Sequence, residues 1–193
     1  MTATRPGVTP LHWTVPTFHR ACSIGLFEGR RAILLRGVIL EQGKMNPPHA
    51  VAILIVNEVL RVAFGSGWTI RVQLPLILSQ ETDPVPDLAV VPGGVRDFAA
   101  AHPTMATLVV EVSDTTLDPD LTIKAEIYAT AGVLDYWVID VENRQLHVFR
   151  DPVPLPEGLG ATAYRSHVTL AATDSVSPLA QPNHSIRVTE MLP

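Results

Sequence analysis

The sequence has a single cysteine, few charged residues and no excess of positive charge. Cys22 has no second thiol with which to form an internal disulfide or a thiolate metal cage, and a small buried apolar role is more common for such a residue than a nucleophilic one. The net charge is −5, whereas proteins that depend on phosphate contacts usually carry a basic face. Any contact with nucleic acid therefore requires a local basic patch.

Several basic residues close together in the sequence are candidates for that patch, although each alone is equally well explained as solvated surface: Arg30, Arg31, Arg36, Lys44, Arg61 and Arg71.

Long apolar runs are also absent from the sequence. No run reaches the roughly 18 residues that a membrane span needs, and the N-terminal stretch lacks a continuous apolar signal-peptide core. We therefore expect a cytoplasmic protein without a membrane-spanning segment.

Length and composition predict one folded domain. The 193 residues suffice for one ordinary core and are too few for two domains of usual size. With 47% hydrophobic and 17% charged residues, the chain falls in the globular class rather than the disordered one. Residues 1–17 hold several prolines and no periodic pattern, so we expect an N-terminal arm followed by a single domain over residues 18–193.

Hydrophobic periodicity and turn residues predict the order of the elements. A hairpin at one edge of the sheet is expected over residues 32–40, with an interruption at Gly37. Asn46 is placed to cap a helix that ends at Gly65. The further elements expected are strands over 68–78, 86–91 and 107–113, a helix over 118–131, strands over 136–140 and 145–149, and two or three more strands toward the C-terminus.

The core over about residues 46–141 thus has the order helix, three strands, helix, strand. A parallel return needs a crossover of about a dozen residues. The fold class predicted is α/β, with a mixed β-sheet flanked by helices (αβββαβ) and additional N- and C-terminal strands.

Glu111 is the residue hardest to explain structurally, because an ionised carboxylate inside an apolar strand is costly unless it is paired or bound to a metal. Asp87 lies near the start of the preceding strand, so both acids reach one sheet end if the two strands are neighbours. Two carboxylates, a backbone carbonyl and several waters form a typical Mg²⁺ site. Val112 would be the natural carbonyl donor.

Lys124 lies in the middle of the predicted crossover helix. There it could orient an attacking water or stabilise developing negative charge. The structural alternative is an ordinary i, i+4 helix pair with Asp120. Asp87 alone is likewise explained as a turn residue that follows Pro86.

Further residues are candidates for accessory roles. His49 has two interpretations. In the first it is a helix-entry residue whose ring faces solvent or a neighbouring carboxylate; in the second it lines a phosphate path at the helix N-terminus. Glu41 is expected on a loop that faces the site as an extra acid. Glu58 is expected on the polar face of its helix.

The stretches GRRAILLRGVILE, NPPHA, PDLAVV, LVVEVSDTTLDPDLTIKAEIYATAGVLDYWVID and QLHVFRDP resemble the Uma2 family of restriction-endonuclease-like proteins, within the PD-(D/E)XK nuclease superfamily. The likeness covers roughly residues 25–150. It implies a core in which Asp87 and Glu111 bind Mg²⁺ or Mn²⁺. Ser113 stands where a lysine is usual, and the family's displaced lysine matches Lys124, with Asp120 on its D-x-x-x-K pattern.

The resemblance has one departure, because Ile33 and Arg36 stand where family members carry acids. Our leading hypothesis is a Mg²⁺-dependent endonuclease that hydrolyses DNA phosphodiester bonds, with Asp87 and Glu111 holding the metal and Lys124 assisting the attacking water. The alternative is a catalytically inactive nuclease-fold domain that binds nucleic acid or protein. A homodimer formed through the C-terminal strands is a further possibility.

Overall fold

The computed structural model describes residues 9–43, 45–114, 117–155 and 162–193. The chain divides into two units, of which the first comprises residues 1–43 and 77–84 and the second comprises residues 44–76 and 85–193. Asp87, Glu111 and Lys124 all belong to the second unit, so its architecture determines how they are positioned.

A six-stranded mixed sheet forms the centre of the second unit, and its strands run in the order β3-β4-β5-β6-β7-β8. Only β5 and β6 pair in parallel, while every other neighbouring pair in this sheet is antiparallel. The mixed sheet predicted from the element order is confirmed. Its strands are β3 (Trp68–Val72), β4 (Leu88–Pro92), β5 (Leu108–Ser113), β6 (Asp135–Asp140), β7 (Gln145–Pro154) and β8 (Thr162–Ala171).

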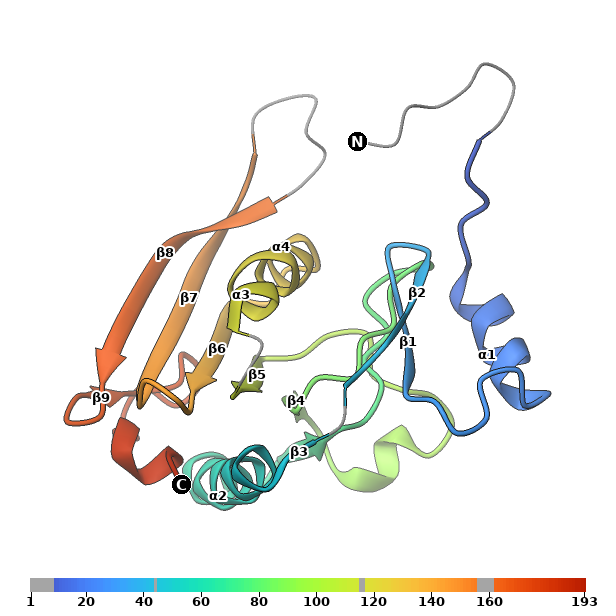
Figure 1. Cartoon of the computed structure of the whole chain (residues 1–193). Helices are drawn as coiled ribbons and strands as arrows, with labels where there is room; N and C mark the ends of the chain where they lie inside the picture. The colour runs from blue at the N-terminus through green and yellow to red at the C-terminus, as the bar shows by residue number, and fades with distance from the viewer. Residues whose placement is uncertain (1–8, 44, 115–116, 156–161) are drawn as a thin grey trace. The chain divides into compact units, whose positions relative to one another are not determined.

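Helix α2 (Pro47–Phe64) covers one face of this sheet (Figure 1). Asn46 caps it as predicted, since its side-chain Oδ1 accepts a hydrogen bond from the His49 N–H at 3.1 Å. The buried stripe of the helix packs with apolar residues of β4 and β5, among them Leu88 and Val110. Side chains alternate along a strand, so Asp87 and Glu111 lie on the opposite face.

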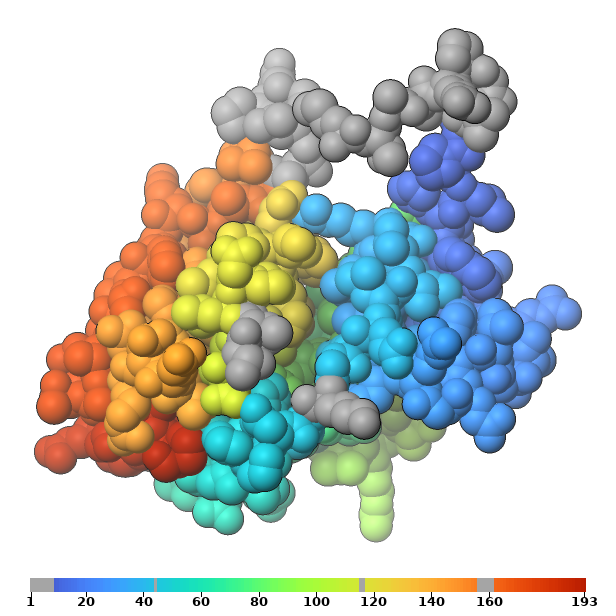
Figure 2. All heavy atoms as spheres, in the orientation of Figure 1, coloured from blue at the N-terminus to red at the C-terminus, as the bar shows by residue number. Residues whose placement is uncertain are grey.

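A second helical layer covers that opposite face (Figure 1). It consists of α3 (Leu117–Pro119), the π-helical turn η2 (Asp120–Lys124) and α4 (Ala125–Thr130). Figure 2 shows this layer in yellow beside the β7–β8 hairpin in orange, in agreement with the packing of α4 on β8. The crossover helix was predicted, whereas its wide π turn was not.

The C-terminal strands close the α2 side of the core. β9 (Ser175–Val176) and β10 (Ile186–Arg187) form an antiparallel pair, and the short helix η3 (Val188–Met191) follows. Their buried residues, including Val176 and Met191, belong to the same core as α2. The expected additional C-terminal strands are therefore confirmed.

The first unit contains α1 (Val15–Ser23) and a hairpin of β1 (Ala32–Leu35) and β2 (Val38–Glu41). No helix was predicted here, and the arm expected over residues 1–17 is wrong at its C-terminal end because α1 begins at Val15. The Arg36–Gly37 turn has φ angles of 51° and 74°, as a tight hairpin of this kind requires. The hairpin is a separate two-stranded sheet and not an edge of the larger sheet, which corrects that expectation.

Three further expectations need correction. Cys22 is exposed on α1 and is not a buried apolar residue. The strand predicted over residues 68–78 ends at Val72, since Gln73 turns the backbone out of the ladder with a φ of 49°. By length and hydropathy, α2 does reach what a membrane span needs, contrary to the sequence-based expectation. Its buried stripe in the core, with Ala52, Val56 and Leu60 fully buried, is that of a core helix.

Candidate active site

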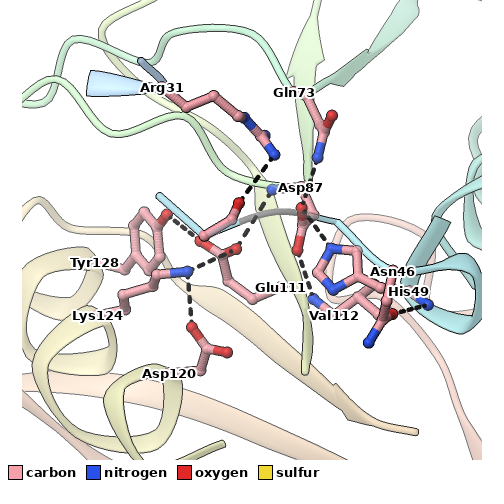
Figure 3. Close-up of polar contacts among 11 residues, drawn as sticks. Arg31, Asn46, His49, Gln73, Asp87, Glu111, Val112, Asp120, Lys124 and Tyr128 are labelled. Carbon is pink, nitrogen blue, oxygen red and sulfur yellow. Dashed lines mark hydrogen bonds and ion pairs between the residues drawn. The ribbon is translucent and has the colours of Figure 1, made fainter. Parts of the chain in front are cut away.

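Asp87 and Glu111 lie side by side at one end of the sheet (Figure 3). Asp87 immediately precedes β4, and the register of β4 with β5 places it opposite Glu111. The Asp87 backbone N–H donates to Glu111 Oε2 at 3.4 Å, and the Val112 N–H donates to Asp87 Oδ2 at 2.9 Å. The structure therefore brings together the two acids that the sequence predicted would meet.

Lys124 faces this acid pair from the helical layer (Figure 3). Its Nζ lies 3.0 Å from Glu111 Oε2 and 2.7 Å from Asp120 Oδ1. Lys124 therefore makes both contacts that were considered for it: one with Glu111 and an i, i+4 pair with Asp120. About a quarter of the Lys124 side chain is exposed, at 25%, while the Glu111 side chain is buried.

Tyr128 is a site residue that the sequence reasoning missed. Its hydroxyl donates a hydrogen bond of 2.6 Å to Glu111 Oε1, and the residue is fully buried. Asp120, Lys124 and Tyr128 recur at four-residue spacing, which places them along one side of the helix. That spacing was the signal in the sequence, but a tyrosine in this position is also an ordinary core residue.

Two further side chains hold Asp87. His49 Nε2 and Gln73 Nε2 lie 3.2 Å and 3.1 Å from Asp87 Oδ1, so His49 faces a neighbouring carboxylate, one of the alternatives considered for it. The Gln73 backbone N–H also donates to the Asp87 carbonyl at 3.0 Å. Gln73 occupies the left-handed region, which costs a non-glycine residue on the order of 1–3 kcal/mol and is common at functional sites. No sequence pattern pointed to Gln73.

The remaining accessory candidates have different positions. Ser113 is buried at the end of β5, and its hydroxyl has no hydrogen-bond partner among the described residues. Glu58 is exposed on α2, as predicted. Glu41 belongs to the first unit, where it pairs with Arg30 at 3.6 Å, and its accessory role stays a prediction. The same holds for the Val112 carbonyl as a metal ligand.

Burial raises the pKa values of the site acids, but for one of them hydrogen bonds reverse the shift. Burial raises the pKa of Glu111 to about 7, although Lys124 opposes this shift. Burial also raises the pKa of Asp120. For Asp87, burial acts in the same direction, but hydrogen bonds from His49, Val112 and Gln73 outweigh it, so its pKa is lowered.

Contacts with the acids raise the pKa values of the two basic groups of the site, His49 and Lys124. The hydrogen bond to Asp87 raises the pKa of His49. Burial by itself would lower the pKa of Lys124, but Glu111 and Asp120 outweigh it and raise the pKa. Lys124 is therefore a charged donor at neutral pH and not a base.

The donor set fits a divalent cation. Glu111 and Asp120 share the ammonium group of Lys124, Asp87 is paired with His49, and the carboxylate oxygens of Asp87 and Glu111 are the hard ligands that a divalent cation prefers. Within the described part of the chain, no three His, Cys, Asp or Glu side chains form a ready-made cage. Asp87 and Glu111 would thus hold the ion at an open site whose other positions belong to water or substrate, as Mg²⁺ prefers.

The basic residues considered for a DNA-binding patch do not all share a surface. Arg61 is exposed on α2, whereas Arg71 lies on β3 between residues that pack toward α2, so its side chain is on the opposite face of the sheet. Lys44 lies outside the described residues. Arg30, Arg31 and Arg36 belong to the first unit.

A mixed sheet with helices on both faces and with strand-end acids that meet a helix lysine defines the protein as restriction-endonuclease-like in fold. The sequence matches the profile of the Uma2 family, described as "Putative restriction endonuclease", over residues 15–189. The chain belongs to this family.

A solved structure is similar in fold. It is described as "a putative nuclease belonging to DUF820" from Anabaena variabilis, and it superimposes with a TM-score of 0.62 at 12% sequence identity. The likeness covers 83% of this chain and 88% of that one. No curated protein matches this chain.

Proposed function

We propose that this protein is a divalent-metal-dependent endonuclease that hydrolyses DNA phosphodiester bonds in the cytoplasm, with Asp87 and Glu111 as ligands for Mg²⁺ or Mn²⁺. The observation that carries the proposal is the position of Lys124, whose Nζ lies 3.0 Å from Glu111 at the sheet end where both acids meet and whose side chain is partly exposed. Membership in a family described as restriction endonucleases supports it.

The residues divide the chemistry among them. A divalent cation at this site would polarise the phosphodiester and lower the pKa of a bound water. The lowered pKa of Asp87 keeps it ionised through the neutral range, so it is a ligand at any working pH. Lys124 donates hydrogen bonds from its charged ammonium group, which orients the attacking water and stabilises negative charge that develops on the phosphate.

A cleavage assay with Mg²⁺ or Mn²⁺ tests the proposal. Wild-type protein should cleave duplex or single-stranded DNA, and Lys124→Ala should lose this activity while it still binds metal. Arg165→Ala is the matched control, since Arg165 is an exposed cation of β8 that pairs with Asp151 at 2.5 Å. Full cleavage by the Lys124 variant would remove the role assigned to the lysine.

One observation favours an inactive nucleic-acid- or protein-binding domain as the second candidate. Ile33, which the family resemblance places at the position of an acid, is a buried core residue of the first unit, and its side chain offers no metal ligand. If this reading is right, millimolar Mn²⁺ should give no heat of binding. A homodimer through the C-terminal strands is compatible with either function, and chromatographic mass measures it directly.

A further inference from the structure

Arg71 is a buried cation on the same face of the sheet as the acid pair. Its neighbours Ile70 and Val72 pack into the α2 core, so the Arg71 side chain is directed to the other face, which also carries Asp87 and Glu111. Only 6% of Arg71 is exposed. Buried charges are normally paired, because the loss of hydration is costly.

Among the residues that the structure describes, no carboxylate pairs with Arg71. Its Nη2 donates to the Pro75 carbonyl at 3.2 Å and to His102 Nδ1 at 3.1 Å, and the guanidinium lies 5.5 Å from the centre of the Phe98 ring. Its Nε is buried and has no hydrogen-bond partner among the described residues. Burial alone lowers the pKa of Arg71, with no contribution from a carboxylate.

The contact with Arg71 also determines which ring nitrogen of His102 carries the proton. A guanidinium can only donate, so His102 Nδ1 must accept, and the proton of the neutral ring lies on Nε2. His102 itself is exposed. The pair therefore offers an N–H donor at the surface with an uncompensated positive charge beneath it, which is a combination that attracts an anion.

We propose that Arg71 and His102 form an anion site for a phosphate of the nucleic-acid backbone, next to the phosphate handled by the acid pair. This inference rests on the proposed nuclease function. Gln73, which contacts Asp87, is two residues from Arg71 on the same chain segment, a Cα separation of about 7 Å in extended backbone. A DNA strand carries one phosphate per about 3.4 Å of helix axis. If the scissile phosphate lies at Asp87, a flanking phosphate of the same strand would contact the exposed His102 ring, with the buried Arg71 charge behind it.

DNA binding by the metal-free protein at several salt concentrations tests the site. Loss of one charged phosphate contact should reduce the slope of log K against log salt by about 0.9 for duplex DNA, and we expect this for Arg71→Gln. Arg165→Gln is the control, because Arg165 is an exposed cation of β8 that is already paired with Asp151; its slope should equal that of wild type.

His102→Ala keeps the test decisive if Arg71→Gln does not fold, since His102 is exposed. This variant should weaken DNA binding several-fold while its unfolding temperature stays close to that of wild type. Unchanged affinity in His102→Ala together with an unchanged slope in Arg71→Gln would overturn the inference. The absence of DNA binding by wild-type protein would overturn it as well.

Cleavage kinetics separate this inference from the proposed function. Arg71→Gln should raise KM several-fold with kcat within about twofold of wild type, as expected for a contact that binds substrate and transition state alike. If wild type cleaves no DNA but Arg71→Gln still lowers the salt slope, the anion site stands and the nuclease proposal fails. If wild type cleaves DNA and Arg71→Gln changes neither slope nor KM, the anion site alone fails.

Discussion

The Nζ atom of Lys124 lies 3.0 Å from Oε2 of Glu111, which joins the helical layer to the central strand β5. This contact compensates a carboxylate in an otherwise apolar strand, while part of the Lys124 side chain stays exposed. The stability of the fold and the proposed metal-dependent hydrolysis therefore depend on the same two side chains, Lys124 and Glu111. Changes of pH and substitutions at these residues should affect stability and activity together.

Lys124→Ala should destabilise the metal-free protein more at high pH than at low pH. The pKa of Glu111 is about 7 in wild type and is higher in the variant, because Lys124 lowers it; above that pKa the variant has charged carboxylates at Glu111 and Asp120 without their cation. Breaking a buried pair in this way costs about 3–5 kcal/mol. Below that pKa, protonation relieves part of the loss. Urea unfolding of variant and wild type near pH 5 and pH 8 measures the difference, and an equal loss at both values would contradict the account.

Glu111→Gln should change how the stability of the metal-free protein depends on pH. The pKa of Glu111 is raised from 4.5 to about 7 on folding, so the proton binds more tightly to the folded state. Its stabilising contribution is complete below pH 4.5 and is lost as the pH rises through 7. The free energy of unfolding of wild type, relative to Glu111→Gln, should therefore fall over this window. A difference that is independent of pH would show that Glu111 ionises normally.

Tyr128→Phe removes the hydroxyl that donates to Glu111 Oε1. Hydrogen bonds to charged groups contribute about 1.5–3 kcal/mol, so we expect a loss of that size when Glu111 is ionised. The pKa of Glu111 should rise further, because this hydrogen bond lowers it. Mn²⁺ binding should then require a higher pH than in wild type.

Tyr164→Phe is the control for that prediction, since the Tyr164 hydroxyl donates to the Val133 carbonyl at 2.7 Å, away from the acids. Its stability loss should be about 1 kcal/mol, as for a neutral hydrogen bond. The pH dependence of Mn²⁺ binding should stay that of wild type. If both variants shift this dependence alike, Tyr128 has no special relation to Glu111.

Arg150→Met should weaken the scaffold without changing the site. Asp135 is fully buried on β6, and its Oδ1 accepts hydrogen bonds from Arg150 Nε and Trp137 Nε1, each at 2.8 Å. Removal of the guanidinium leaves a buried charge uncompensated, which costs about 3–5 kcal/mol. Chemical denaturation should show this loss, while the Mn²⁺ affinity of the folded variant should equal that of wild type. A marked loss of affinity would mean that the ion pair also acts on the site.

The sequence predicted the parts of this fold that repeat a simple pattern. β5 was predicted because its residues are almost all apolar, and Glu111 was conspicuous because a charge inside such a strand needs a partner. α1 was missed because Pro16, like the prolines before it, is typical of an arm, although Thr14 and Thr17 form a capping box. Its buried positions, Val15 and Phe18, follow helical spacing.

Other parts of the site depend on geometry that local patterns do not encode. Gln73 reaches Asp87 because the chain leaves β3 with a positive φ, and no residue type at this position signals that turn. Tyr128 contacts Glu111 only after the crossover helix has packed on the sheet. The burial of Arg71 likewise depends on Phe98 and His102, which lie far from it in the sequence.

Calorimetric titration of the metal-free protein with Mn²⁺ tests the central claim most directly, because it asks whether Asp87 and Glu111 together hold a cation. We predict saturable heat for wild type and for Asp151→Asn, an exposed acid paired with Arg165, and no heat for Asp87→Asn or Glu111→Gln. Equal heat in all four proteins, or none from wild type at millimolar Mn²⁺, would contradict the account.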